Sequence, residues 1–157
     1  MTLVGRMNHL ASNRLDPVAR AAARFHARRF AAGKGRWLDR YFGAPVFSLE
    51  VVGRRSGEPR TVMLICTRRG DDIIVGGSNG GNHRPPNWYL NLCAAGEAVV
   101  QVGSDRWSVT ARHAEGDERA DCWARLVATY PDFATYQSLT EREIPVVVLE
   151  RSGAADT

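Results

Sequence analysis

Short runs of alternating apolar and polar residues occupy the middle of the chain, and this period of two is typical of half-buried β-strands. Glycines and other turn-forming residues separate the runs, and strands and helices do not alternate regularly. The pattern therefore predicts an antiparallel sheet. We expect strands over residues 46–52, 61–68, 72–76, 97–102, 107–113 and 144–149.

Helical spacing of apolar residues predicts three helices, each with its own start or stop signal. Asp16-Pro17 places an N-cap aspartate before a proline at the first helical position. Gly96 and Pro131 end the other two, and a short turn is expected after Pro131. The expected helical ranges are 16–32, 87–95 and 117–130.

These elements predict an α+β fold, in which an antiparallel, barrel-like sheet carries flanking helices. A length of 157 residues suits a single domain, because no repeat or linker interrupts the chain. Within residues 1–157 we expect an N-terminal helical segment, 16–42, followed by the barrel, 43–150. The ends, 1–15 and 151–157, carry no pattern that would order them.

The predicted N-terminal helix is basic along one face, where Arg20, Arg24 and Arg28 recur every four residues. Val18 and Phe25 are the large apolar residues of another face. One interpretation is a surface helix packed lightly on the body. The other is a lid over an apolar pocket, or a contact with an anionic membrane surface.

Composition and charge narrow the function classes only a little. Hydrophobic residues make up 44% and charged residues 24% of the chain, as in ordinary globular proteins. The net charge of +4 is concentrated in the N-terminal third, which favours a local anionic ligand or a membrane contact over nucleic acid. The first residues lack the apolar stretch of a signal peptide, so we expect a cytoplasmic protein, with membrane association as the alternative.

The three cysteines and four histidines are scattered without the spacing of metal ligands. We therefore expect no metal site, and we expect reduced, buried thiols.

The predicted turn 53–60 contains more positive charge than a turn requires. Gly57 suits a position where φ must be positive, while Arg54, Arg55 and Arg60 can aim their guanidinium groups at one small region. Such a cluster suits a phosphate or a polycarboxylate. The alternative is a solvated loop that is basic for solubility.

A second polar stretch, Ser78-Asn79-Gly80-Gly81-Asn82, follows a predicted strand and precedes a predicted helix. Glycines at such a junction let main-chain N–H groups approach an anion closely. In the helix that follows, Trp88 and Leu92 lie four residues apart and are expected to pack in the core. Asn87 and Asn91 have the same spacing and present amides, either to a ligand or to the turn.

Taken together, these motifs resemble the deazaflavin-dependent nitroreductase family, with order and spacing in agreement over residues 43–150. The motifs are Gly-Arg-Arg-Ser-Gly-Glu-Pro-Arg at 53–60, Ser-Asn-Gly-Gly at 78–81, Pro-Asn-Trp-Tyr-Leu-Asn-Leu at 86–92, Tyr-Pro at 130–131, Tyr-Gln at 136–137 and Arg-Glu-Ile-Pro-Val-Val-Val-Leu at 142–149. The resemblance implies a split β-barrel of the kind that binds flavin-like cofactors, and it implies the deazaflavin coenzyme F420. It also implies hydride transfer from the reduced cofactor to a quinone, a nitroaromatic or another electron-poor acceptor such as an activated enone.

The resemblance assigns site residues to this chain. The implied cofactor-binding residues are Arg54, Arg55, Ser56, Arg60, Thr61, Val62, Met63, Leu64, Ser78, Asn79, Gly80, Gly81, Trp88 and Asn91. The implied acceptor pocket contains Ile65, Ser78, Tyr130, Phe133 and Tyr136. Tyr136 and Tyr130 are the candidate proton donors, with solvent as the alternative.

The chain departs from the family pattern at three positions. Asn79 stands where the best-known members have lysine, and Ile65 and Phe133 stand where they have tyrosine. One cationic contact and two hydroxyl groups are therefore missing. The resemblance accordingly does not imply that this chain reduces nitroimidazoles or menaquinone.

Three rival functions stay open. One is an FMN-dependent oxidoreductase of the same fold, and another is a non-catalytic carrier of deazaflavin or a lipid-like molecule. The third is a small anion-binding or membrane-peripheral protein without a cofactor. The chain is expected to be a monomer or a homodimer.

Overall fold

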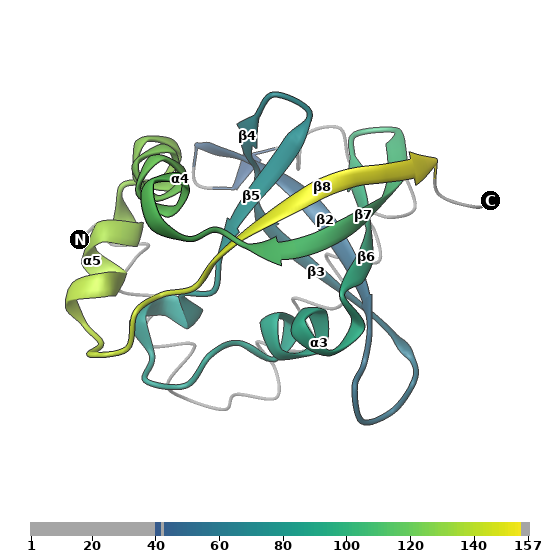
Figure 1. Cartoon of the computed structure of the whole chain (residues 1–157), viewed down its shortest axis with the longest axis horizontal. Coiled ribbons are helices and arrows are strands. Elements are labelled where there is room, and N and C mark those ends of the chain that lie inside the picture. The colour runs from purple at the N-terminus through teal and green to yellow at the C-terminus, as the bar shows by residue number, and fades with distance from the viewer. Residues whose placement is uncertain (1–39, 42, 155–157) are drawn as a thin grey trace.

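The computed structural model describes residues 40–41 and 43–154 (Figure 1). The predicted basic helix over 16–32, and with it the choice between its two interpretations, lies outside the described residues. No helix within the described ranges is long and apolar enough to cross a bilayer.

Eight strands of the described residues form one antiparallel sheet in the order β1-β2-β6-β7-β8-β5-β4, with β3 paired to β2. The strands are β1 (Arg40–Tyr41), β2 (Ala44–Val52), β3 (Pro59–Ile65), β4 (Thr67–Arg69), β5 (Asp72–Gly76), β6 (Glu97–Val102), β7 (Asp105–His113) and β8 (Val146–Ala154). The helical elements are the 3₁₀ turn η1 (Asn79–Gly81) and the helices α3 (Asn87–Ala95), α4 (Gly116–Thr129) and α5 (Asp132–Ser138).

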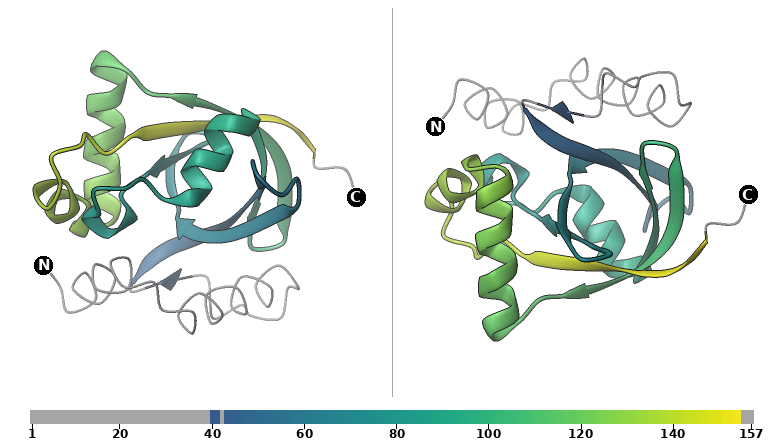
Figure 2. Two further views of the ribbon diagram at one scale, coloured as in Figure 1. Left: turned by 90° about the horizontal axis from the view of Figure 1, so that it is seen from below. Right: turned by 90° about the horizontal axis from the view of Figure 1, so that it is seen from above.

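A single residue closes this sheet into a barrel. Cys66 alone separates β3, which pairs with β2 along its whole length, from β4, which pairs with β5. The Cys66 N–H donates to the Pro45 carbonyl at 2.8 Å and anchors the bend. The chain thus passes from one side of the sheet to the other, and the strands curve round a common interior (Figure 2). The predicted α+β class with a barrel-like sheet is confirmed.

Alternating residues of the same strands fill two separate cores. In β5, Ile73 and Val75 face the barrel interior, whereas Ile74 faces outward beneath α4 and α5. In β8, Val147 and Val148 divide in the same way. Strands buried on both faces need continuous apolar runs, which explains the sequences of β5 and β8.

Two of the expected elements and one expected side-chain burial differ from the structure. The expected strand 61–68 is broken at Cys66, because its two halves have different partners. The residues expected as a turn after Pro131 form the helix α5. The prediction that Cys93 is buried is wrong, since its position on α3 leaves it exposed, while Cys66 and Cys122 are buried.

The expectation that residues 151–157 are unordered is also wrong for residues 151–154. Residues 151–154 extend β8 and pair with the start of β7. The guanidinium of Arg151 lies 5.0 Å from the ring centre of the buried Trp107, and this cation–π contact helps to hold a segment with no apolar pattern.

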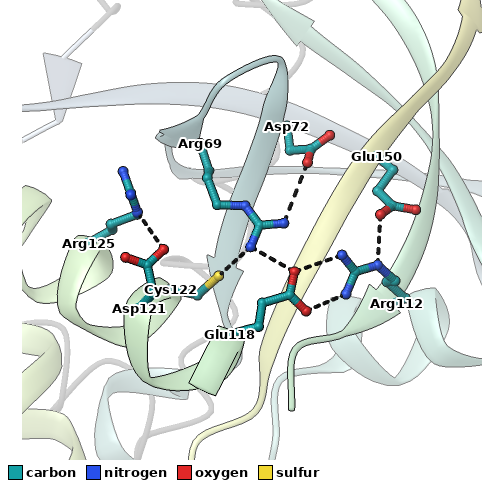
Figure 3. A network of polar contacts seen from close by, with 8 residues as sticks. All are labelled: Arg69, Asp72, Arg112, Glu118, Asp121, Cys122, Arg125 and Glu150. Atoms are coloured by element: carbon teal, nitrogen blue, oxygen red, sulfur yellow. Dashed lines mark hydrogen bonds and ion pairs between the residues drawn. The ribbon is translucent and has the colours of Figure 1, made fainter. Parts of the chain in front are cut away.

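A network of charged side chains fastens α4 to the sheet (Figure 3). Glu118 of α4 accepts two hydrogen bonds from Arg112 of β7, at 2.6 and 2.8 Å, and lies 2.7 Å from Nη1 of Arg69 in β4. Arg112 also donates to Glu150 of β8 at 2.7 Å. The hydrogen bonds from Arg112, and then those from Arg69, lower the pKa of Glu118 from about 4.5 to about 2.

This pKa predicts how Glu118 contributes to acid stability. Because its pKa is lower in the folded state, its stabilisation is complete above about pH 4.5 and disappears as the pH falls toward about 2. Glu118→Gln should therefore be less stable than the wild type at neutral pH, and the difference should shrink over that interval. Urea unfolding at several pH values measures this difference in the free energy of unfolding between the variant and the wild type. Glu141→Gln is the matched control, because the described part of the chain offers Glu141 no ion pair, and equal profiles for the two variants would contradict the prediction.

Candidate active site

The turn between β2 and β3 is built by its own backbone. The N–H groups of Ser56 and Gly57 donate to the Gly53 carbonyl at 3.1 and 2.8 Å, and Gly57 has a φ of +69°, as predicted for its glycine. The Ser56 hydroxyl accepts hydrogen bonds from the guanidinium of Arg60 at 3.1 Å and from the Glu58 N–H at 3.3 Å. Ser56 thus organises the turn and orients Arg60.

The three arginines of this turn have different surroundings. Arg54 is bound to Asn91 of α3, whose Oδ1 accepts from Nη1 at 2.8 Å and from the Arg54 backbone N–H at 3.3 Å. Arg60 lies against Ser56, and Arg55 is exposed. Within residues 43–154, none of the three has a carboxylate partner, whereas five other arginines of the same region do.

Strand β3 continues from this turn with one edge unpaired by any strand of the described chain. Its residues 61–65 are all half-buried. Val62 and Leu64 pack against the interior core, as does Trp88 of α3, while Ile65 packs against the outer core. The predicted cofactor-binding stretch is therefore the open edge of the barrel, with α3 beside the hairpin (Figure 2).

The Ser78–Asn82 loop has an unusual backbone. Ser78 is in the right-handed helical region, whereas Asn79, Gly80 and Gly81 have φ values of 50°, 62° and 79°. Gly81 admits no side chain, because a Cβ there would lie 2.8 Å from the Tyr136 carbonyl. A right-handed residue followed by left-handed ones turns successive N–H groups to one side and suits an anion or a carbonyl oxygen.

The side chain of Asn79, one of the three expected departures from the family pattern, forms a hydrogen bond within its own segment. Its Nδ2 donates to the Arg84 carbonyl at 2.9 Å. The side chain therefore shapes the segment 79–84 and adds no positive charge at this position.

The residues of the predicted acceptor pocket come together in the outer core. Phe133 packs edge to face against both Tyr130 and Tyr136, and Ile65 of β3 contacts the same cluster. The two tyrosine hydroxyls are 3.4 Å apart and buried. Burial, and then the hydrogen bond with Tyr136, raise the pKa of Tyr130. Ser78, the fifth predicted member, is buried at the start of the loop next to α5.

Two surface depressions lie elsewhere, on either side of His113. One is lined by Cys93, Ala111 and Arg112, and the other by Glu115 and Arg119. None of the predicted site residues lines either depression. Among the described residues, no group of three His, Cys, Asp or Glu side chains could hold a metal ion.

Sequence reasoning assigned no role to Arg142, which the structure puts under the Ser78–Asn82 loop. Its guanidinium donates to the carbonyls of Gly77, Ser78 and Asn82 at 2.9, 2.7 and 2.9 Å. The flanking Glu141 and Glu143 make this arginine look like part of a solvated charge run, so the sequence carried little signal for its inward orientation.

Known proteins share this architecture and these motifs. The sequence profile of the F420H(2)-dependent quinone reductase family matches residues 22–151. F420H(2)-dependent quinone reductase Rv1261c of Mycobacterium tuberculosis is 36% identical over 132 residues, which cover 82% of this chain and 89% of that protein.

Two solved structures extend the likeness to the fold. The F420-H2 dependent reductase FDR-A is 36% identical with a TM-score of 0.64, over 68% of this chain and 94% of its own. A structure described as a domain-swapped dimer is 32% identical with a TM-score of 0.68, over 85% and 96% of the two chains. The predicted split β-barrel is thereby confirmed. This chain belongs to the F420H(2)-dependent quinone reductase family.

Proposed function

We propose that this reductase transfers a hydride from F420H2 to a quinone. Nitroaromatics and activated enones are the weaker acceptors in this proposal, and the protein works as a monomer or a homodimer. A contact between the basic N-terminal segment and a membrane surface stays a prediction. The observation that carries the proposal is the Arg54–Asn91 pair, because it fixes a cationic turn against the helix of the candidate site.

The charges of the turn fit the anionic part of the cofactor. F420 has a phosphate and an oligoglutamate tail, and the guanidinium groups of Arg54, Arg55 and Arg60 have no carboxylate partner in the described part of the chain. A ligand with several negative charges would supply those partners. A phosphate alone, as in FMN, would leave some of them unused.

The open edge of β3 and the Ser78–Asn82 loop would hold the ring. Residues Thr61–Leu64 would run beneath it, and the Ser78–Gly81 segment would offer the main-chain N–H groups of Ser78 and Asn79 and one hydroxyl. When bound, F420H2 supplies the hydride, and the protein orients it and excludes water. Trp88 packs against the barrel interior and would support the same surface from the side.

Reduction of a quinone also requires a proton at the quinone oxygen. The paired hydroxyls of Tyr130 and Tyr136 are the phenols of the predicted acceptor pocket, and phenols are protonated near neutral pH. The raised pKa makes Tyr130 a weaker acid than an ordinary phenol, so Tyr136 is the preferred donor. A protonated phenol can donate a hydrogen bond to the oxygen as negative charge develops there. The aromatic and aliphatic surroundings, with Phe133 and Ile65, suit a flat apolar acceptor.

Removing two of the turn arginines should weaken cofactor binding. In Arg55→Ala/Arg60→Ala we expect the Kd for F420 to rise about tenfold or more, since hydrogen bonds to charged groups contribute roughly 1.5–3 kcal/mol each. Binding of FMN should change less, because FMN lacks the acidic tail. Fluorescence titration measures both constants. Arg125→Ala, which removes an exposed arginine of α4, is the control, and an equal Kd for F420 in both variants would refute this site.

Acceptor preference is tested by oxidation of F420H2 in the presence of quinones, nitroaromatics and activated enones. We expect the highest kcat/KM with quinones, because the aromatic cluster offers an apolar surface and few hydroxyl donors. A protein that binds F420H2 but oxidises it with none of these acceptors would be the non-catalytic carrier.

Tyr136→Phe should lower kcat for quinone reduction by about 100-fold, the contribution typical of a positioned acid, without changing the Kd for F420. Tyr130→Phe, which removes the partner hydroxyl of the pair, is the companion variant and should have a smaller effect. Stopped-flow oxidation of F420H2 measures the chemical step. An unchanged rate in both variants would assign the proton to solvent.

A further inference from the structure

Arg142 makes an unusual set of contacts for a charged side chain. All three of its hydrogen bonds go to backbone carbonyls of one loop, those of Gly77, Ser78 and Asn82. No carboxylate lies within ion-pair distance of it in the described residues. The side chain is partly buried, and this desolvation lowers the pKa of Arg142. The three hydrogen bonds to carbonyls offset part of this desolvation cost.

The segment that carries Arg142 is itself fixed. Gln137 of α5 donates to the Arg142 carbonyl and accepts from the Ile144 N–H, each at 2.9 Å. The Pro145 carbonyl then accepts from the Gly77 N–H at 2.9 Å. The backbone that carries Arg142 is thus held at residue 142 and at residues 144 and 145, which fixes the base of its side chain.

The direction of the accepting carbonyls determines where the loop's N–H groups point. In a trans peptide the C=O and the following N–H are antiparallel, and the described residues contain no cis bond. Because the Gly77 and Ser78 carbonyls face Arg142, the N–H groups of Ser78 and Asn79 face away from it. Neither N–H donates to another group in the described chain.

The loop therefore has two faces with different chemistry. One face carries the carbonyls that Arg142 binds, and the other presents two adjacent N–H donors. The positive guanidinium lies behind these donors and has no carboxylate partner among the described residues, so the donor face favours an oxygen that bears negative charge.

We propose that Arg142 is a positioning residue: through three backbone carbonyls it holds the N–H groups of Ser78 and Asn79 toward an oxygen of the bound cofactor. The inference rests on the proposed function for the identity of the ligand. The orientation of the loop itself is set by contacts within the protein and does not depend on the identity of the ligand. A lysine at this position would keep the charge but lose the planar fork that reaches three carbonyls at once.

Arg142→Lys tests this role with two independent readouts. In the protein without cofactor, amide hydrogen exchange at Gly81 and Asn82 should accelerate about tenfold or more, while exchange in β6 and β7 stays unchanged. These two N–H groups donate within the loop to Ser78 and Asn79. The Kd for F420 should rise about tenfold, the loss expected from misplacing one charge-assisted hydrogen bond.

Arg119→Lys is the matched control, because Arg119 also donates to a backbone carbonyl, that of Ile144, but makes no hydrogen bond or ion pair with the loop 77–82 in the described part of the chain. It should change neither readout. If Arg142→Lys loosens the whole barrel, Gln137→Leu provides the second test. It keeps the arginine but frees its segment from α5, and it should accelerate exchange in the same loop.

Loop exchange that is unchanged in both Arg142→Lys and Gln137→Leu would overturn the proposal. If the wild type binds F420, the proposal would also be overturned by an Arg142→Lys variant that has faster loop exchange but the same Kd for F420 as the wild type. If the wild type does not bind F420, the proposed function fails, and the exchange measurement still decides whether Arg142 holds the loop.

Discussion

The change of hydrogen-bonding partner at Cys66 is the constraint on which the structure depends. A strand that pairs with β2 up to Ile65 and with β5 from Thr67 must bend between them, and the Cys66–Pro45 hydrogen bond fixes that bend. Closing the sheet in this way leaves one edge of β3 without a partner strand among residues 40–41 and 43–154. A backbone edge of that kind is costly if it is buried, and residues 61–65 of β3 are only half-buried.

The two cores give this open edge its chemical character. Its inward residues, Val62 and Leu64, belong to the packing of the barrel, whereas Ile65 belongs to the packing of α4 and α5. The same strand thus connects the cationic turn at one end with the aromatic cluster at the other. A ligand with a charged tail at one end and a flat ring at the other has the same order of charged and apolar parts as this strand.

Local signals in the sequence predicted much of this arrangement. Gly57 and Gly96 have the positive φ that their positions suggested, and α3 begins and ends where the pattern placed it. What could not be predicted depends on contacts between distant segments. Asn91 is 37 residues from Arg54, and Arg142 is at least 60 residues from each carbonyl it binds, so no local pattern reveals either contact. The last strand was underestimated for the same reason, because Arg151 is held by the distant Trp107.

The exposure of Cys93 offers an experimental handle. The other two thiols of the chain, Cys66 and Cys122, are buried, and burial raises the pKa of both, so a maleimide would react first on α3. Cys93 is two residues beyond Asn91, the side chain that accepts from Arg54. A fluorophore attached there would move with the helix that supports the candidate site. Its emission would report ligand binding in the unmutated protein and would not rely on the absorbance of the cofactor.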